Sequence, residues 1–114
     1  MKLTGKCKEE FNKWYFKTVR GNEENLLGAT NAEWFYLLTK SMQYGVFEDY
    51  FDSVGVRVFI NEEFDTMGQY QRGFNPVVNN VKLYKDNDCF HTRPEARIAA
   101  IEKANELRNE VLNK

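Results

Sequence analysis

The chain has 114 residues, the size of one domain, because a single hydrophobic core commonly serves about 100–150 residues. Hydrophobic residues make up 42% and aromatic residues 15%, and charges of both signs are interleaved, so the composition excludes a disordered tail protein. The formal net charge of −1 excludes the bulk basicity typical of many nucleic-acid-binding proteins, and we treat residues 1–114 as a single domain.

Membrane and export signals are absent from the sequence pattern. No uncharged apolar run approaches the roughly 20 residues that a membrane-spanning helix needs, and residues 1–11 lack the apolar stretch of a secretory signal. We therefore expect a cytoplasmic protein. In that compartment Cys7 and Cys89 are expected to be reduced thiols, with a disulfide between them as the minor alternative.

A first helix is predicted over residues 6–19, where apolar side chains recur at spacings typical of one helical face. Thr4 is suited to cap its start. Gly21 followed by Asn22 provides the stop signal, because both residues tolerate the left-handed conformation that ends many helices.

A second helix is predicted to start at Thr30 or the next residue, because Thr30 and Glu33 have the spacing of a capping box. Helical spacing of apolar residues continues from there and passes Gly45. We expect either one long helix or two helices joined by a bend at Gly45, and in both cases Gly55 ends the helical segment.

Beyond Gly55 the pattern changes to that of β-strands. Strands are predicted over three ranges, 56–60, 69–74 and 77–84. Residues 61–68 are expected to form a turn or long hairpin loop, and residues 85–88 a hydrophilic turn. Pro76 is expected to break the second strand, because proline cannot donate a hydrogen bond to the ladder.

The last helix is predicted from Thr92 as its cap, with Pro94 in the first turn, where the missing N–H has no helical partner to lose. Small and apolar residues then follow one helical face, at Ala96, Ala100, Ala104, Leu107 and Val111. The whole order predicts an α+β domain with two N-terminal helices, a small antiparallel sheet of two or three strands, and a C-terminal amphipathic helix packed on it.

Catalytic and metal-binding patterns are weak. His91 is the only histidine, and with Cys89 it forms the sole candidate nucleophile–base couple, without a glycine elbow or oxyanion loop. Their spacing to Asp86 and Asp88 matches no usual zinc pattern. The sequence contains neither a dinucleotide-binding glycine motif nor a phosphate-binding loop. We therefore predict no catalytic residue, no metal and no cofactor, and a protein that is not an enzyme.

A protein-binding surface is predicted from charge and aromatic content. Residues 31–70 carry seven acidic and two basic side chains, and the helical segments hold more aromatic residues than one face can bury. The predicted protein-binding surface consists of Tyr44, Glu48, Asp49, Tyr50 and Asp52. Packing of the aromatics on several sides of a helix is the alternative. The partner is expected to be another protein, and a homodimer contact stays open.

Nucleic-acid binding is the alternative function. From about residue 32 the predicted order is α-β-β-β-α, which resembles the double-stranded-RNA-binding domain, whose last helix starts with basic residues that contact phosphate. The candidate nucleic-acid-binding residues are Arg72, Lys82, Lys85, Arg93 and Arg97. The chain departs from that family, because the lysine pair is missing and the exposed face of the last helix is rich in glutamate.

Two stretches carry a further resemblance: SMQYGVFEDYFDSVG over residues 41–55 and TRPEARIAAIEKANEL over residues 92–107. Together they resemble small uncharacterised proteins encoded by bacteriophages, prophages and mobile elements. The resemblance implies a setting in the bacterial host cytosol, where such proteins often act by binding a host protein. It implies no shared catalytic residue or ligand.

Overall fold

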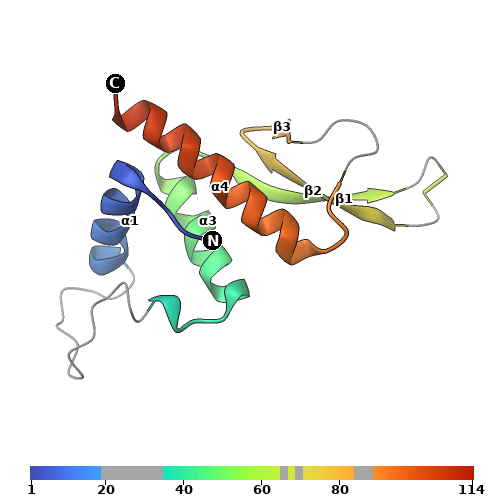
Figure 1. Ribbon diagram of the computed structural model, residues 1–114, viewed down its shortest axis with the longest axis horizontal. Coiled ribbons are helices and arrows are strands. Elements are labelled where there is room, and N and C mark those ends of the chain that lie inside the picture. The colour runs from blue at the N-terminus through green and yellow to red at the C-terminus, as the bar shows by residue number, and fades with distance from the viewer. Residues whose placement is uncertain (19–34, 65–66, 69–70, 84–88) are drawn as a thin grey trace.

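The computed structural model describes residues 1–18, 35–64, 67–68, 71–83 and 89–114 of the chain. Its elements are α1 (Gly5–Thr18), α3 (Lys40–Ser53), β1 (Val58–Phe64), β2 (Gln71–Val78), β3 (Val81–Lys82) and α4 (Arg93–Leu112). The strands form one antiparallel sheet in the order β1-β2-β3. The helix α4 packs on β1 and β2, contacts α3 from its second turn at Arg97, and reaches α1 near its C-terminal end (Figure 1). The predicted α+β class, with the C-terminal helix on the sheet, is confirmed.

The helix α1 lies within one residue of its predicted range, and its apolar face is buried at Cys7, Phe11 and Tyr15. Thr4 directly precedes it, as expected, but the cap comes from another helix. The backbone N–H of Cys7 donates to Asn109 Oδ1 of α4 at 2.9 Å. The predicted stop at residues 21–22 lies outside the described residues.

The prediction of one helix running from Thr30 is wrong, because residues 37–39 are not helical. The helix α3 begins after Thr39, whose hydroxyl accepts a hydrogen bond from the N–H of Met42 at 3.3 Å. The buried Gln43 side chain donates to the carbonyl of Leu38 at 2.9 Å and so satisfies a backbone group at the break. The Thr30–Glu33 capping box lies outside the described residues.

The helix α3 passes Gly45 without a break, so the alternative of two helices joined by a bend at Gly45 is also wrong. Its end agrees with the prediction. Val54 occupies the C-cap position, and Gly55 follows with a φ of 81°. That conformation is the left-handed one that glycine adopts at the end of many helices.

The sheet differs from its prediction at Pro76, which lies inside β2 opposite Ile60 instead of ending the strand. The carbonyl of Pro76 accepts from the N–H of Leu83 at 2.9 Å, so the polar backbone edge of Pro76 faces β3 and not β1. In an antiparallel strand the N–H and C=O of one residue point the same way. The missing N–H of Pro76 therefore costs the β1–β2 ladder nothing.

The other two strands also differ from their predicted ranges. The first strand runs to Phe64 and uses residues that were expected to form a loop. The expected third strand is divided, because Val77 and Val78 belong to β2 and a turn follows at Asn79 and Asn80. Both asparagines have positive φ, at 51° and 67°, which is the geometry of a tight hairpin turn. The predicted turn at residues 85–88 lies outside the described residues.

The start of α4 agrees with its prediction. The Thr92 hydroxyl accepts from the N–H of Glu95 at 3.3 Å and donates to the Glu95 carboxylate at 2.8 Å. The alanine face is fully buried at Ala96, Ala100 and Ala104.

Among the residues that the structure describes, no helix is both long enough and apolar enough to span a membrane.

Candidate functional site

The structure buries both tyrosines of the predicted protein-binding surface. Tyr44 is 7% exposed and Tyr50 is 0% exposed, so the prediction that these two tyrosines belong to an exposed binding surface is wrong. Tyr50 packs edge-on against Phe11, with ring centroids 5.3 Å apart, inside an aromatic core that α1 and α3 share. The alternative interpretation, packing of aromatics on several sides of a helix, holds for these two residues.

The hydroxyl of Tyr50 belongs to a partly buried polar network that joins three helices. It donates to Glu10 Oε1 at 2.7 Å and lies 3.7 Å from the thiol of Cys7. Arg108 of α4 donates to both carboxylate oxygens of Glu10, at 2.9 and 2.8 Å. No spacing rule in the sequence links these residues, since Glu10 and Arg108 are 98 positions apart. The network explains why a tyrosine can be fully buried here.

The three acidic residues of the predicted surface, Glu48, Asp49 and Asp52, are all exposed on α3. They lie within four positions of one another, and the pKa of the Glu48 carboxyl is raised. Loss of hydration on the side of the carboxyl that faces the protein is the main cause, and repulsion from the carboxylates of Asp49 and Asp52 adds to it, while Tyr44 and Arg97 act weakly in the opposite direction. The group therefore carries a concentrated negative charge whose repulsion a cation would relieve.

A shallow cleft of about 400 Å³ opens between α3 and the start of β1. It is lined by Glu48, Asp52, Arg57, Val58 and Phe59. Phe59 is 40% exposed, so the aromatic side chain that accompanies the carboxylates at the surface comes from β1 and not from α3. We call these five residues the acidic cleft. The sequence predicted its two carboxylates, but not its aromatic wall, because nothing local shows that β1 folds back beside α3.

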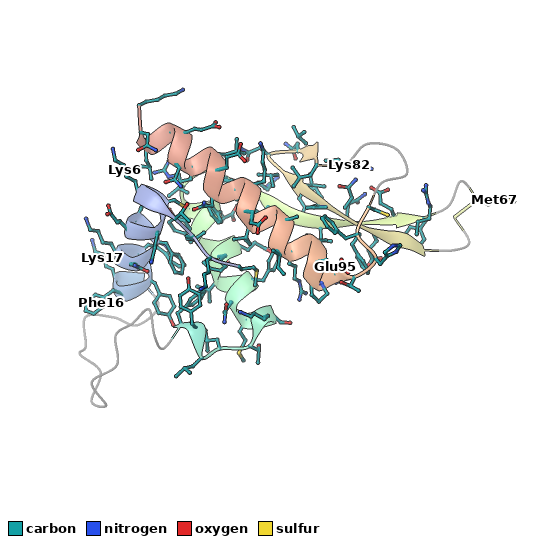
Figure 2. All side chains as sticks on the ribbon, viewed as in Figure 1. Lys6, Phe16, Lys17, Met67, Lys82 and Glu95 are labelled. Atoms are coloured by element: carbon teal, nitrogen blue, oxygen red, sulfur yellow. The ribbon has the colours of Figure 1, made fainter. Side chains whose placement is uncertain are left out.

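The candidate nucleic-acid-binding residues of the described chain do not form one basic surface. Arg93 pairs with Glu62 and covers the ring of Phe74 at 5.1 Å, while Lys82 Nζ lies 2.9 Å from Glu63 Oε1. Glu62 and Glu63 are adjacent in β1, so their side chains project to opposite faces of the sheet. Figure 2 accordingly places Lys82 on β3, apart from the first turn of α4 at Glu95.

Arg97 is turned toward α3. Its guanidinium lies 5.2 Å from the ring centroid of Tyr44, and its Nη1 donates to the Ser41 hydroxyl at 3.2 Å. A small cavity of about 100 Å³ separates the starts of α3 and α4 beside Arg97, with predominantly apolar walls. Arg72 lies in β2 and is partly buried, and Lys85 is outside the described residues.

The remaining candidate chemistry centres on two cysteines and one histidine. Both cysteines are free thiols, and the thiol of Cys89 lies 3.7 Å from the carbonyl of Arg72. His91 is exposed just before α4. Over the described ranges, no group of three or more His, Cys, Asp or Glu side chains is arranged to hold a metal ion.

Comparison of the chain with protein-family models, with curated proteins and with solved structures found no match.

Proposed function

We propose that this chain is a non-enzymatic binding protein that contacts another protein through the acidic cleft and the neighbouring Asp49. The single observation that carries the proposal is the cleft itself, in which Glu48 and Asp52 meet the half-exposed Phe59 beside an open space of about 400 Å³. Exposed aromatic surface beside charge is typical of protein interaction sites. The resemblance to phage and mobile-element proteins adds the setting, a host protein in the bacterial cytoplasm.

Double-stranded-RNA binding has less support. The charge of Arg93 is met by Glu62 and that of Lys82 by Glu63, so two of the cations needed for phosphate contacts already have carboxylate partners. Affinity for nucleic acid depends on several free cations that replace condensed counterions. We propose the protein partner for that reason.

Affinity capture from bacterial lysate, with and without nuclease treatment, tests the proposal. We expect a protein that survives nuclease and that is lost from the Glu48→Lys/Asp52→Lys double variant. A Glu9→Lys variant on α1 is the charge control, because Glu9 is exposed and belongs to a different helix. Capture that requires intact RNA, or capture that is equal for all variants, would reject the acidic cleft as the binding site.

A further inference from the structure

The peptide groups of β1 divide into two sets that point in opposite directions. The N–H of Arg57 donates to Asn79 Oδ1 at 2.9 Å, and its carbonyl accepts from the N–H of Asn79 at 2.8 Å, so both groups face the turn that ends β2. The N–H and C=O groups of successive residues in a strand point in alternating directions. Phe59 and Asn61 therefore face β2. The peptide groups of Val58, Ile60 and Glu62 face away from it.

The partner strand supports this assignment independently. In β2 the N–H and C=O of Phe74 exchange two hydrogen bonds with the backbone of Phe90, at 2.8 and 2.9 Å. The peptide groups of Phe74 therefore face away from β1. Pro76 also faces away, through its bond to Leu83. The residues opposite them in β1 are Glu62 and Ile60, whose peptide groups consequently point away from β2, at the outer edge of the sheet. Among the described residues, no strand pairs with this outer edge of β1.

The outer edge of β1 begins at the acidic cleft. Val58 is only 4% exposed, yet it lines the cleft together with Phe59, Glu48 and Asp52. The first outward-facing peptide group of β1 thus belongs to a residue that borders the same open space as two carboxylates and an aromatic ring. A ligand that uses both features has to offer a polar backbone and positive charge.

We propose that β1 accepts an extended, lysine- or arginine-rich segment of the partner protein as an added strand, with a cationic side chain placed in the acidic cleft. The proposal rests on the proposed function and specifies how the partner is recognised. Backbone hydrogen bonds to Val58, Ile60 and Glu62 hold the segment, and the cleft selects its charge. Phe59 contacts the aliphatic stem of the cationic side chain.

Charge complementarity favours a basic segment over a second copy of this chain. The β1 edge of a second copy would bring no counter-charge, because β1 contains two glutamates, Glu62 and Glu63, and no lysine or arginine. Among the described residues, Arg57 is the cation that lines the cleft, and Arg97 of α4 attracts the Glu48 carboxylate, against the three carboxylates of Glu48, Asp49 and Asp52. A basic strand supplies the missing counter-charge.

Backbone hydrogen exchange measured by NMR tests the proposal on the full chain. The probe is a short capped peptide that alternates valine with lysine. Spermine is the matched control, because it carries positive charge without peptide groups. With the peptide, we expect amide exchange at Val58, Ile60 and Glu62 to slow by about tenfold or more, because these N–H groups gain acceptors. Exchange at Phe59 and Asn61 should stay unchanged, since their N–H groups already face β2.

The same titration is repeated on two variants. Glu48→Lys/Asp52→Lys is expected to weaken peptide binding about tenfold or more, while Glu9→Lys leaves it unchanged. Peptide binding without slower exchange at Val58, Ile60 and Glu62 would overturn the added strand while leaving an acidic binding surface in place. Absence of peptide binding, or protection of the same amides in a dimer without peptide, would also overturn it. Failure of the proposed function is recognised separately, when affinity capture from lysate gives the same result for the wild type and for Glu48→Lys/Asp52→Lys.

Discussion

Arg108 holds Glu10 in a two-pronged ion pair, with Nε to Oε1 at 2.9 Å and Nη2 to Oε2 at 2.8 Å. This contact joins the last helix to the first, and Tyr50 of α3 donates to the same carboxylate. Both side chains are mostly shielded from water, at 18% and 31% exposed. A single carboxylate therefore connects three helices, which makes Glu10 a sensitive position for stability.

Replacing Glu10 by glutamine is expected to lower the free energy of unfolding by about 1–2 kcal/mol at neutral pH, because Arg108 loses its charged acceptor. The hydrogen bond from Arg108 holds the pKa of Glu10 below its ordinary value of 4.5. Because the pKa of Glu10 is lower in the folded state than in the unfolded state, its ionised carboxylate stabilises the protein at pH values above the unfolded-state pKa. This contribution is lost as the pH falls through the folded-state pKa. Urea denaturation should thus show the variant approaching the wild type below pH 4.5. A gap independent of pH would contradict this account.

Gly73 and Gly45 form a matched pair for testing backbone packing. An added Cβ at Gly73 would lie 2.3 Å from the carbonyl oxygen of Phe90 and 2.7 Å from the thiol of Cys89. Gly73→Ala is therefore expected to destabilise the fold by about 2–4 kcal/mol, because the Phe74–Phe90 backbone pair must move.

At Gly45, in the middle of α3, an added Cβ meets nothing within 4 Å. Gly45→Ala is expected to stabilise the protein by about 0.5–1 kcal/mol, because alanine restricts the unfolded chain and favours the helix. Thermal unfolding of the two variants beside the wild type measures both effects. Equal shifts of the unfolding temperature in the same direction for both variants would show that the close contact at Gly73 does not determine the effect of Gly73→Ala on stability.

Glu48 is expected to reduce stability, in contrast to Glu10. Burial and the carboxylates of Asp49 and Asp52 raise its pKa, so the charged form is less favourable in the folded state than in the unfolded state. The cost is absent at low pH and appears as pH rises through the raised pKa. Glu48→Gln should therefore stabilise the protein at neutral pH by a few tenths of a kcal/mol, roughly the scale of exposed charge pairs.

The check on Glu48→Gln is urea denaturation at neutral and at acidic pH, with Glu9→Gln as the control on α1. A gain at neutral pH that vanishes in acid is the expected result. A loss of stability at neutral pH would mean that the Glu48 carboxylate has a stabilising partner, and the cleft would then lack an uncompensated charge.

The two thiols are expected to differ in reactivity. Cys7 is fully buried in the core, and burial raises the pKa of its thiol, which lowers the fraction of reactive thiolate. Cys89 is partly exposed. Under native conditions a maleimide should label Cys89 well before Cys7, as read by peptide mass mapping, and urea should make the two rates converge. Faster labelling of Cys7 would show that the contact between α1 and α3 opens locally.

Local signals in the sequence were sufficient for several elements. Thr92 and Pro94 placed the start of α4, its alanine spacing identified the buried face, and Gly55 marked the end of α3. Each of these signals depends on residues within about a turn of one another, through capping, steric freedom or helical periodicity. They hold whatever the rest of the chain does, which is why they could be predicted.

Other features depended on partners distant in sequence. Pro76 is tolerated in β2 because its polar edge faces β3, and Tyr50 is buried because Glu10 accepts its hydroxyl hydrogen. The acidic cleft likewise exists only because β1 brings Phe59 back beside α3. The sequence alone determined the α+β class, the ends of its clearest helices and the carboxylates of α3. Tertiary structure decided which aromatics are exposed and which strand edge has no partner among the described residues, because burial and backbone pairing are set by contacts between distant segments.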